Sequence, residues 1–162
     1  MKWVIMIQYK LERVKIEDKD KLYRLLQYSL YEESLTDQNE MNNEAIFEYK
    51  WFDSYFQENN REAYIIKEQE TNKILGGAMV NQYMQKSKDG HSIAEFMIVP
   101  KYRWLKIGKR VAIELFNMHK GNWEVKPSYG SKSALLFWKS VIDEYTQNDN
   151  TFEDGIFIFE SK

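Results

Sequence analysis

A block of three short β-type segments in the middle of the chain constrains the fold more than any other feature. Residues 63–67, 74–84 and 92–99 are rich in the apolar and β-branched side chains that favour strands. Polar residues that favour turns separate these segments at 70–73 and 87–90. The pattern predicts a three-stranded antiparallel meander, so the chain is expected to fold around a sheet.

Helical patterns lie on both sides of this block. Apolar residues recur at helical spacing over 18–35 and 43–57 before it, and over 107–120 and 134–145 after it. Further strands are expected over 2–9, 123–125 and 155–159. The order β-α-α-β-β-β-α-β-α-β mixes helices and strands around a central meander, which indicates a mixed α+β (α/β) fold.

No part of the 162-residue chain has the composition of a linker between domains. Only two prolines occur, and there is no repeat, low-complexity block or Ser/Gly-rich stretch. A chain of this length commonly folds around one core. Aromatic residues make up 15% of the sequence, so we expect an aromatic-rich core in a single domain that spans residues 1–162.

Composition and spacing exclude several classes of chemistry. Cysteine is absent, which excludes disulfides, thiolate metal sites and a cysteine nucleophile. With 23 Lys and Arg against 25 Asp and Glu, both scattered along the chain, no binding to nucleic acid is expected. His91 and His119 show no metal-ligand spacing, so we expect no metal site and place both at the surface. We find neither a secretory leader nor an apolar run of membrane-spanning length, and expect a cytoplasmic protein that makes no membrane contact.

The stretch from residue 93 to residue 110 carries a candidate anion site. A strand runs there into a loop that opens a helix at Ile107, so backbone N–H groups and the positive end of the helix dipole converge. Lys106, Lys109 and Arg110 add positive charge, and a pyrophosphate suits such a place. An ordinary strand-loop-helix with a solvated basic turn remains the alternative.

This stretch and the elements after it resemble the GNAT family of N-acetyltransferases. The resemblance covers the whole order of elements and is most specific between Glu95 and Ile142. The quoted motifs are Lys101-Tyr102-Arg103, Ile107-Gly108-Lys109, Trp123-Glu124-Val125 and Ala134 with Phe137-Trp138. The family implies one mixed sheet of about six to seven strands flanked by four helices, and acetyl-CoA as the co-substrate.

The phosphate-binding loop departs from the family at one position. Members usually carry Gln or Arg, two free positions, Gly, one free position, then Gly or Ala. Here the pattern runs from Arg103 to Gly108 with Lys106 at the first glycine position. Because lysine has a Cβ and prefers negative φ, we expect either a looser approach to the phosphates or a contact from its ammonium.

The resemblance implies a set of CoA-binding residues. Strand backbone would pair with the pantetheine arm, and loop and helix amides would hold the pyrophosphate. Ser131 stands where the family frequently has an asparagine, although a helix N-cap is the favoured role for it. The expected set is Met97, Ile98, Val99, Arg103, Lys106, Ile107, Gly108, Lys109 and Ser131.

Acetyl transfer to an amine needs a base, because an amine with a pKa near 10.4 is almost wholly protonated at neutral pH. Glu95 matches the strand glutamate that many members use, and an outward-facing strand glutamate is the alternative. The tyrosine that protonates the leaving thiolate in the family is replaced by Trp138, and indole cannot act as that acid. Tyr129 is the candidate substitute, with simple packing as its alternative. Departure of the thiolate without an acid also remains open.

The first two helices border the acceptor groove in this family, which makes Tyr31, Glu32, Glu33 and Trp51 candidates for binding a cationic amine. The aromatic stripe with Trp51 can equally be core. We expect a small-molecule or peptide amine acceptor and a monomer or homodimer. The leading hypothesis is direct acetyl transfer from acetyl-CoA to a primary amine. The alternatives are a non-catalytic acyl-CoA-binding module and a small α/β binding protein without a CoA site.

Overall fold

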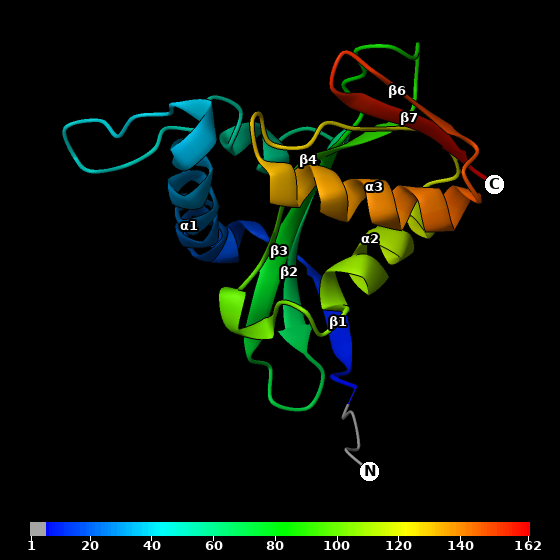
Figure 1. Cartoon of the computed structure of the whole chain (residues 1–162). Helices are drawn as coiled ribbons and strands as arrows, with labels where there is room; N and C mark the ends of the chain where they lie inside the picture. Colours follow the sequence, from blue (N-terminus) through cyan, green and yellow to red (C-terminus); the bar gives the residue numbers. More distant parts are fainter. Residues whose placement is uncertain (1–5) are drawn as a thin grey trace.

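A computed structural model describes residues 6–162, in which helices and strands are mixed along the chain around a central meander (Figure 1). The helices are α1 (Lys19–Asp37), α2 (Ile107–Met118) and α3 (Lys132–Thr146), with short 3-10 turns at η1 (Ile16–Asp18), η2 (Asp53–Phe56) and η3 (Pro100–Tyr102). The strands are β1 (Tyr9–Arg13), β2 (Arg61–Glu68), β3 (Ile74–Asn81), β4 (His91–Ile98), β5 (Gly121–Val125), β6 (Asn150–Glu153) and β7 (Ile156–Ser161).

The strands form one sheet in the order β1-β2-β3-β4-β5-β7-β6. Every neighbouring pair is antiparallel except β4 and β5, which run parallel. The pairing of β4 with β5 covers only the first residues of β4 and ends at the pair Ile93↔Val125. The sheet therefore opens between these two strands, and the rest of β4 pairs only with β3.

Alternating side chains of the central strands enter two separate cores. Tyr64 and Ile66 of β2 pack with α2 and α3, whereas Ala63 and Ile65 pack with α1 and the segment that follows it. In Figure 1, α1 accordingly lies on one side of β2 and β3, and α2 and α3 lie on the other. The sheet thus separates a face covered by α1 from a face covered by the two later helices.

Most predicted elements are confirmed, including the central meander, α1, α2, α3 and the last strand. Of the strand predicted over 2–9, residues 1–5 lie outside the described residues, and the first described strand begins only at Tyr9. The strand β6 was not predicted because Asn150–Glu153 is short and polar. It forms a hairpin with β7 through Asp154 and Gly155, both at positive φ as a tight hairpin turn requires.

The helix predicted over 43–57 is wrong, so three helices flank the sheet in the described residues rather than four. Only the 3-10 turn Asp53–Phe56 forms there. The Asn42 side chain accepts the N–H groups of Glu44 and Ile46, which offers this backbone an alternative to helical hydrogen bonds. Phe47 and Tyr55 are still buried against α1, so the apolar spacing reflects burial without a regular helix.

Candidate functional site

The opening between β4 and β5 exposes one edge of β4 beyond Ile93. Met97 and Ile98, two of the residues expected to bind pantetheine, lie at this end of β4. The Met97 carbonyl faces Gly76 of β3, and the Ile98 carbonyl accepts the Arg103 side chain at 3.1 Å. The third, Val99, has both main-chain groups engaged: its N–H donates to Leu75 (2.7 Å) and its carbonyl accepts from Tyr102 (2.8 Å). Along β4 beyond Ile93, main-chain groups on the side of the opening are therefore not paired with β5. An extended ligand arm needs such unpaired groups in order to bind in the manner of a strand.

The loop into α2 adopts the conformation that glycine would take. Lys106 has φ 60° and ψ 14°, and Trp104 also has a positive φ of 70°. Lysine prefers negative φ, so this left-handed conformation at the helix start costs about 1–2 kcal/mol. The backbone at Lys106 therefore takes a conformation that glycine would adopt without this cost.

The N-terminus of α2 is ready to receive an anion. No side chain caps it, and the first N–H that finds a partner within the helix is that of Arg110, which donates to Lys106 at 3.2 Å. The N–H groups of residues 107–109 thus have no helical partner. A Cβ on Gly108 would lie 3.2 Å from the Phe137 ring, so this glycine also lets α2 pack closely on α3.

The basic side chains around this helix start have different partners. Arg103 makes a two-point ion pair with Glu32 of α1 (2.8 and 2.6 Å), and Lys109 pairs with Glu144 of α3. The Arg110 guanidinium donates to the Ile7 carbonyl at 2.7 Å. Among the residues that the structure describes, Lys106 is the one basic member of the predicted loop without a side-chain partner, and it is exposed.

Glu95 lies on the face of β4 that α1 covers. Its partner in the register is Met79, which belongs to the core beneath α1. Glu95 is deep in the protein, although part of the residue remains accessible to solvent. Burial, and then the nearby carboxylates of Glu33 and Asp37, raise the pKa of Glu95 well above its ordinary value. Such a carboxyl group is suited to accepting a proton.

The charge of the Glu33 carboxylate of α1 helps to raise the pKa of Glu95, which places the two acids near each other. Glu33 has the hydroxyls of Ser29, 3.5 Å away, and Ser128 as side-chain partners. Burial raises the pKa of the Glu33 carboxyl as well. Tyr49 lies beside this pair, and burial together with the charge on Glu95 raises the pKa of its phenol.

The other predicted acceptor residues do not join this cluster. Tyr31 is 66% exposed on the outer side of α1. Trp51 is 50% exposed, which argues against the core alternative, and its ring already lies under Lys50 (4.8 Å) and Arg61 (5.5 Å). Of the predicted acceptor set, Glu33 is the residue whose charge raises the pKa of Glu95.

The segment before α3 holds the two remaining predicted residues. Tyr129 is 79% exposed. Ser131 is the N-cap of α3, where its hydroxyl accepts the N–H of Ala134 at 3.2 Å, the role favoured from the sequence. Trp138, at the position of the family's tyrosine, is buried against Phe96 and Phe116.

Sequence reasoning placed Glu33 in the acceptor groove but missed its effect on the pKa of Glu95, and it did not single out Tyr49 or Ser128. A signal for Glu33 was present: Leu22, Leu26, Ser29 and Leu30 define the buried face of α1, and Glu33 continues it. An acidic side chain that follows a buried helical face must find a partner. Tyr49 and Ser128 lie in irregular segments, which carry no periodic signal.

The surface placement of His91 and His119 is wrong. Their rings stack with centroids 4.0 Å apart, both are partly buried, and His119 contacts the Glu62 carboxylate. The start of β4 and the end of α2 meet because β5, which follows α2, pairs with β4 at His91↔Trp123. In residues 6–162, no group of three or more acidic or histidine side chains is arranged to hold a metal ion.

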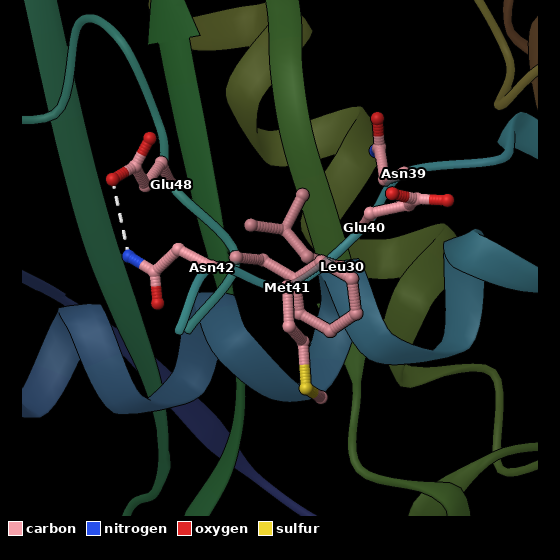
Figure 2. A pocket seen from close by; sticks show the side chains of 7 residues that line it. Leu30, Asn39, Glu40, Met41, Asn42 and Glu48 are labelled. Carbon is pink, nitrogen blue, oxygen red and sulfur yellow. Dashed lines mark hydrogen bonds between the residues drawn. The ribbon is translucent and has the colours of Figure 1, made fainter. Parts of the chain in front are cut away.

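A hollow of about 260 Å³ lies between α1 and the loop that follows it (Figure 2). Glu48 accepts a hydrogen bond from Asn42 at 3.1 Å on one side of it, and Glu40 stands on the other. Its two carboxylates favour cationic over anionic groups. The lining residues are Leu30, Asn39, Glu40, Met41, Asn42, Phe47 and Glu48.

No protein-family model matches this chain, and no curated protein matches it. Within residues 6–162, no helix combines the length and the apolar character needed to cross a membrane.

Solved acetyltransferase structures nevertheless share its architecture. An acetyltransferase structure of the GNAT family from Desulfovibrio desulfuricans is 10% identical, covering 96% of this chain and 100% of its own, with a TM-score of 0.60. The structure of AtaTR bound with AcCoA is 12% identical over 94% of this chain and 93% of that one, with a TM-score of 0.58. An aminoglycoside acetyltransferase from an uncultured soil metagenomic sample, in complex with sisomicin, is 22% identical over 82% and 86%, with a TM-score of 0.58. The protein has the mixed α+β fold of the GNAT acetyltransferases.

Proposed function

We propose that the protein is an N-acetyltransferase that moves an acetyl group from acetyl-CoA to a primary amine by direct transfer. The observation that carries this proposal is Glu95, a deep carboxyl group with a raised pKa on the strand where the sheet opens. The fold supports it at the level of acetyl transfer.

The residues around the opening fit acetyl-CoA. The edge of β4 at Met97 and Ile98 would hold the pantetheine arm, and the amides of residues 107–109 would hold the pyrophosphate. The exposed ammonium of Lys106 would add a charge-assisted contact in place of the missing glycine. When bound, acetyl-CoA supplies the acetyl thioester.

Glu95 is the proposed base. An acceptor amine enters mostly as its ammonium form, and a carboxylate with a raised pKa takes the proton more readily than an ordinary one. Tyr129 remains the candidate acid for the departing thiolate, and its exposure leaves its hydroxyl free to turn toward solvent or ligand. A thiolate with a pKa near 8.5 also departs without an acid.

Two measurements test this proposal. We expect acetyl-CoA to raise the melting temperature, because a ligand at 100 times its Kd adds about 2.7 kcal/mol. A DTNB thiol-release assay over a panel of primary amines then tests turnover. Glu95→Gln should keep the thermal shift and lower turnover by about 10²-fold or more.

A thermal shift without thiol release for any amine would instead favour a non-catalytic acyl-CoA-binding module. Absence of both would favour a binding protein without a CoA site. Unchanged turnover of Glu95→Gln across the pH range would remove Glu95 from the mechanism.

A further inference from the structure

We infer that Glu32 is a positioning residue for the loop into α2: its two-point ion pair with Arg103 ties this loop to α1 and holds it in the conformation that receives the pyrophosphate. The inference rests on the proposed function for the identity of the ligand. The dependence of the loop on Glu32 is a property of the folded protein and can be measured without any ligand.

The Arg103 side chain reaches two elements at once. The turn η3 reverses the chain after β4, and the main-chain N–H of Arg103 donates to the Pro100 carbonyl at 3.2 Å. The Nε group of Arg103 donates to the Ile98 carbonyl at 3.1 Å, and its Nη1 and Nη2 groups donate to the two carboxylate oxygens of Glu32 at 2.8 and 2.6 Å. Because a guanidinium group holds its donors in one rigid plane, these contacts fix its direction. Arg103 therefore joins the end of β4 to α1 at the point where the loop begins.

The loop after Arg103 has little internal support. Trp104 and Lys106 have φ values of 70° and 60°, in a region that is unfavourable for residues with a Cβ. Trp104 is 97% exposed and Leu105 42% exposed, and Lys106 is exposed as well, so no side chain of residues 104–106 is buried. In the described part of the chain, the main-chain N–H groups of these three residues donate to no protein acceptor. Strained residues persist only where the surrounding structure imposes their conformation, so the loop must be held from its ends.

Both ends of the loop are fixed. After the loop, Ile107 is 1% exposed and begins α2 within the core. Before the loop, Arg103 is bound to α1, whose buried face packs against the sheet. The last turn of α1 has a further contact, because a Cβ on Gly130 would lie 3.1 Å from the Cβ of Thr36. Without Glu32 the loop would lose its attachment to this supported helix.

This arrangement places Glu32 on the cofactor side of the protein. The sequence made Glu32 a candidate for binding a cationic amine, but both of its carboxylate oxygens accept hydrogen bonds from Arg103. The ion pair also neutralises much of the charge on Arg103, so the pyrophosphate depends on the main-chain N–H groups of residues 104–109 and on the Lys106 ammonium. The direction of those N–H groups follows from the loop conformation that the ion pair holds.

The order of the loop tests the positioning role without a ligand. Glu32→Gln keeps the length of the side chain but removes its charge and one acceptor oxygen. Nitrogen-15 relaxation should show the order parameters of residues 104–106 falling from about 0.85 in the unmodified chain to about 0.6 or below in Glu32→Gln. Arg103→Gln should have the same effect, and the double variant should have no larger one, because Glu32 acts through Arg103.

Asp53→Asn is the matched control for this experiment. It removes a carboxylate of similar exposure that makes a different ion pair with α1, to Lys19, and it should leave the order of the loop unchanged. Equal order of the loop in Glu32→Gln and in the unmodified chain would overturn the inference.

Cofactor affinity tests the consequence for binding. Isothermal titration calorimetry should show CoA binding Glu32→Gln about fivefold more weakly, a modest effect because the side chains of Arg103 and Glu32 are 36% and 58% exposed. Thiol-release kinetics should show the KM for acetyl-CoA raised by the same factor with kcat nearly unchanged, a split that general loss of structure would not produce. In an Arg103→Gln background, Glu32→Gln should cause no further loss. Tighter binding of CoA by Glu32→Gln would mean that Glu32 withholds Arg103 from the phosphates, and it would overturn the inference.

The two measurements separate this inference from the proposed function. If the unmodified chain binds no CoA, the proposed function fails, and the relaxation data alone decide whether Glu32 positions the loop. If CoA binds and an amine is acetylated while the loop keeps its order and its affinity in Glu32→Gln, only the inference fails.

Discussion

The clearest structural prediction concerns two neighbouring glycines of β3 that differ sharply in the space around them. A Cβ on Gly76 would lie 2.1 Å from the Met97 carbonyl oxygen and 3.1 Å from the Cα of Ile98. A Cβ on Gly77 would meet nothing closer than the Tyr64 carbonyl oxygen at 3.5 Å, which is ordinary van der Waals contact. The same substitution, glycine to alanine, should therefore have opposite consequences at adjacent positions.

For Gly76→Ala to fit, β4 must move away from β3 by about 1 Å, since the obstructing atoms are backbone. Overpacking of this kind costs about 1–3 kcal/mol, and two weakened hydrogen bonds between the strands add about 1 kcal/mol each. We therefore expect Gly76→Ala to lower the free energy of unfolding by about 3–5 kcal/mol. Gly77→Ala should change it by less than about 1 kcal/mol, with a gain favoured because alanine restricts the unfolded chain.

Urea titration monitored by tryptophan fluorescence measures both free energies. Since a change of 1 kcal/mol shifts the melting temperature of a chain of this size by about 2–4 °C, Gly76→Ala should melt about 6–20 °C lower. The displaced strand also carries the edge that we propose holds the pantetheine arm, so acetyl-CoA should lose its thermal shift in Gly76→Ala and keep it in Gly77→Ala. Equal stability of the two variants would refute the reasoning from the close contact.

Two further predictions concern groups outside the proposed site. Glu124 of β5 is only 3% exposed and accepts the N–H groups of Gln85 (2.8 Å), Lys86 (2.7 Å) and Ser87 (2.7 Å). Because Glu124→Gln removes the charge and one acceptor, it should lower the free energy of unfolding, measured by chemical denaturation, by about 2–4 kcal/mol. An unchanged unfolding midpoint would contradict this role. Burial and the nearby His119 lower the pKa of His91 in the folded chain, whereas its value in the unfolded chain is about 6.5. At a pH between these two values the unfolded chain binds more protons, so the free energy of unfolding should decrease as the pH is lowered, by up to about 1.4 kcal/mol per pH unit. Melting temperatures from pH 8 to pH 5 test this, and His91→Asn should show a flatter decline than the unmodified chain.

The loop after α1 illustrates why a spacing rule can identify burial and still miss the structure. Phe47 and Tyr55 recur at helical intervals and are buried, yet the Asn42 side chain competes for the backbone N–H groups and the segment stays irregular. Burial of an apolar side chain depends on the element that packs against it, and the apolar side chains of this loop pack against α1. Periodicity therefore predicted the burial of Phe47 and Tyr55, but neither the exposure of Trp51 nor the backbone that carries these side chains.

The sequence by itself determined the local elements and the loop chemistry. The turns of the meander, the apolar faces of α1, α2 and α3, and the strand-loop-helix with its unpaired amides all follow from residues close together in the chain. Glu95 could be placed on its strand for the same reason. Even the left-handed Lys106 lies in a loop whose length and helix start were evident from the sequence.

Only the tertiary structure decided which of these groups meet. Glu33 and Glu95 come from a helix and a strand that lie in different layers, and the stacked rings of His91 and His119 meet because β5 pairs with the start of β4. A pKa depends on burial and on charges a few ångströms away, and both are properties of the packed layers. The chain order alone identified the candidate base, whereas its raised pKa comes first from burial and then from the carboxylates of α1 that the fold places near it.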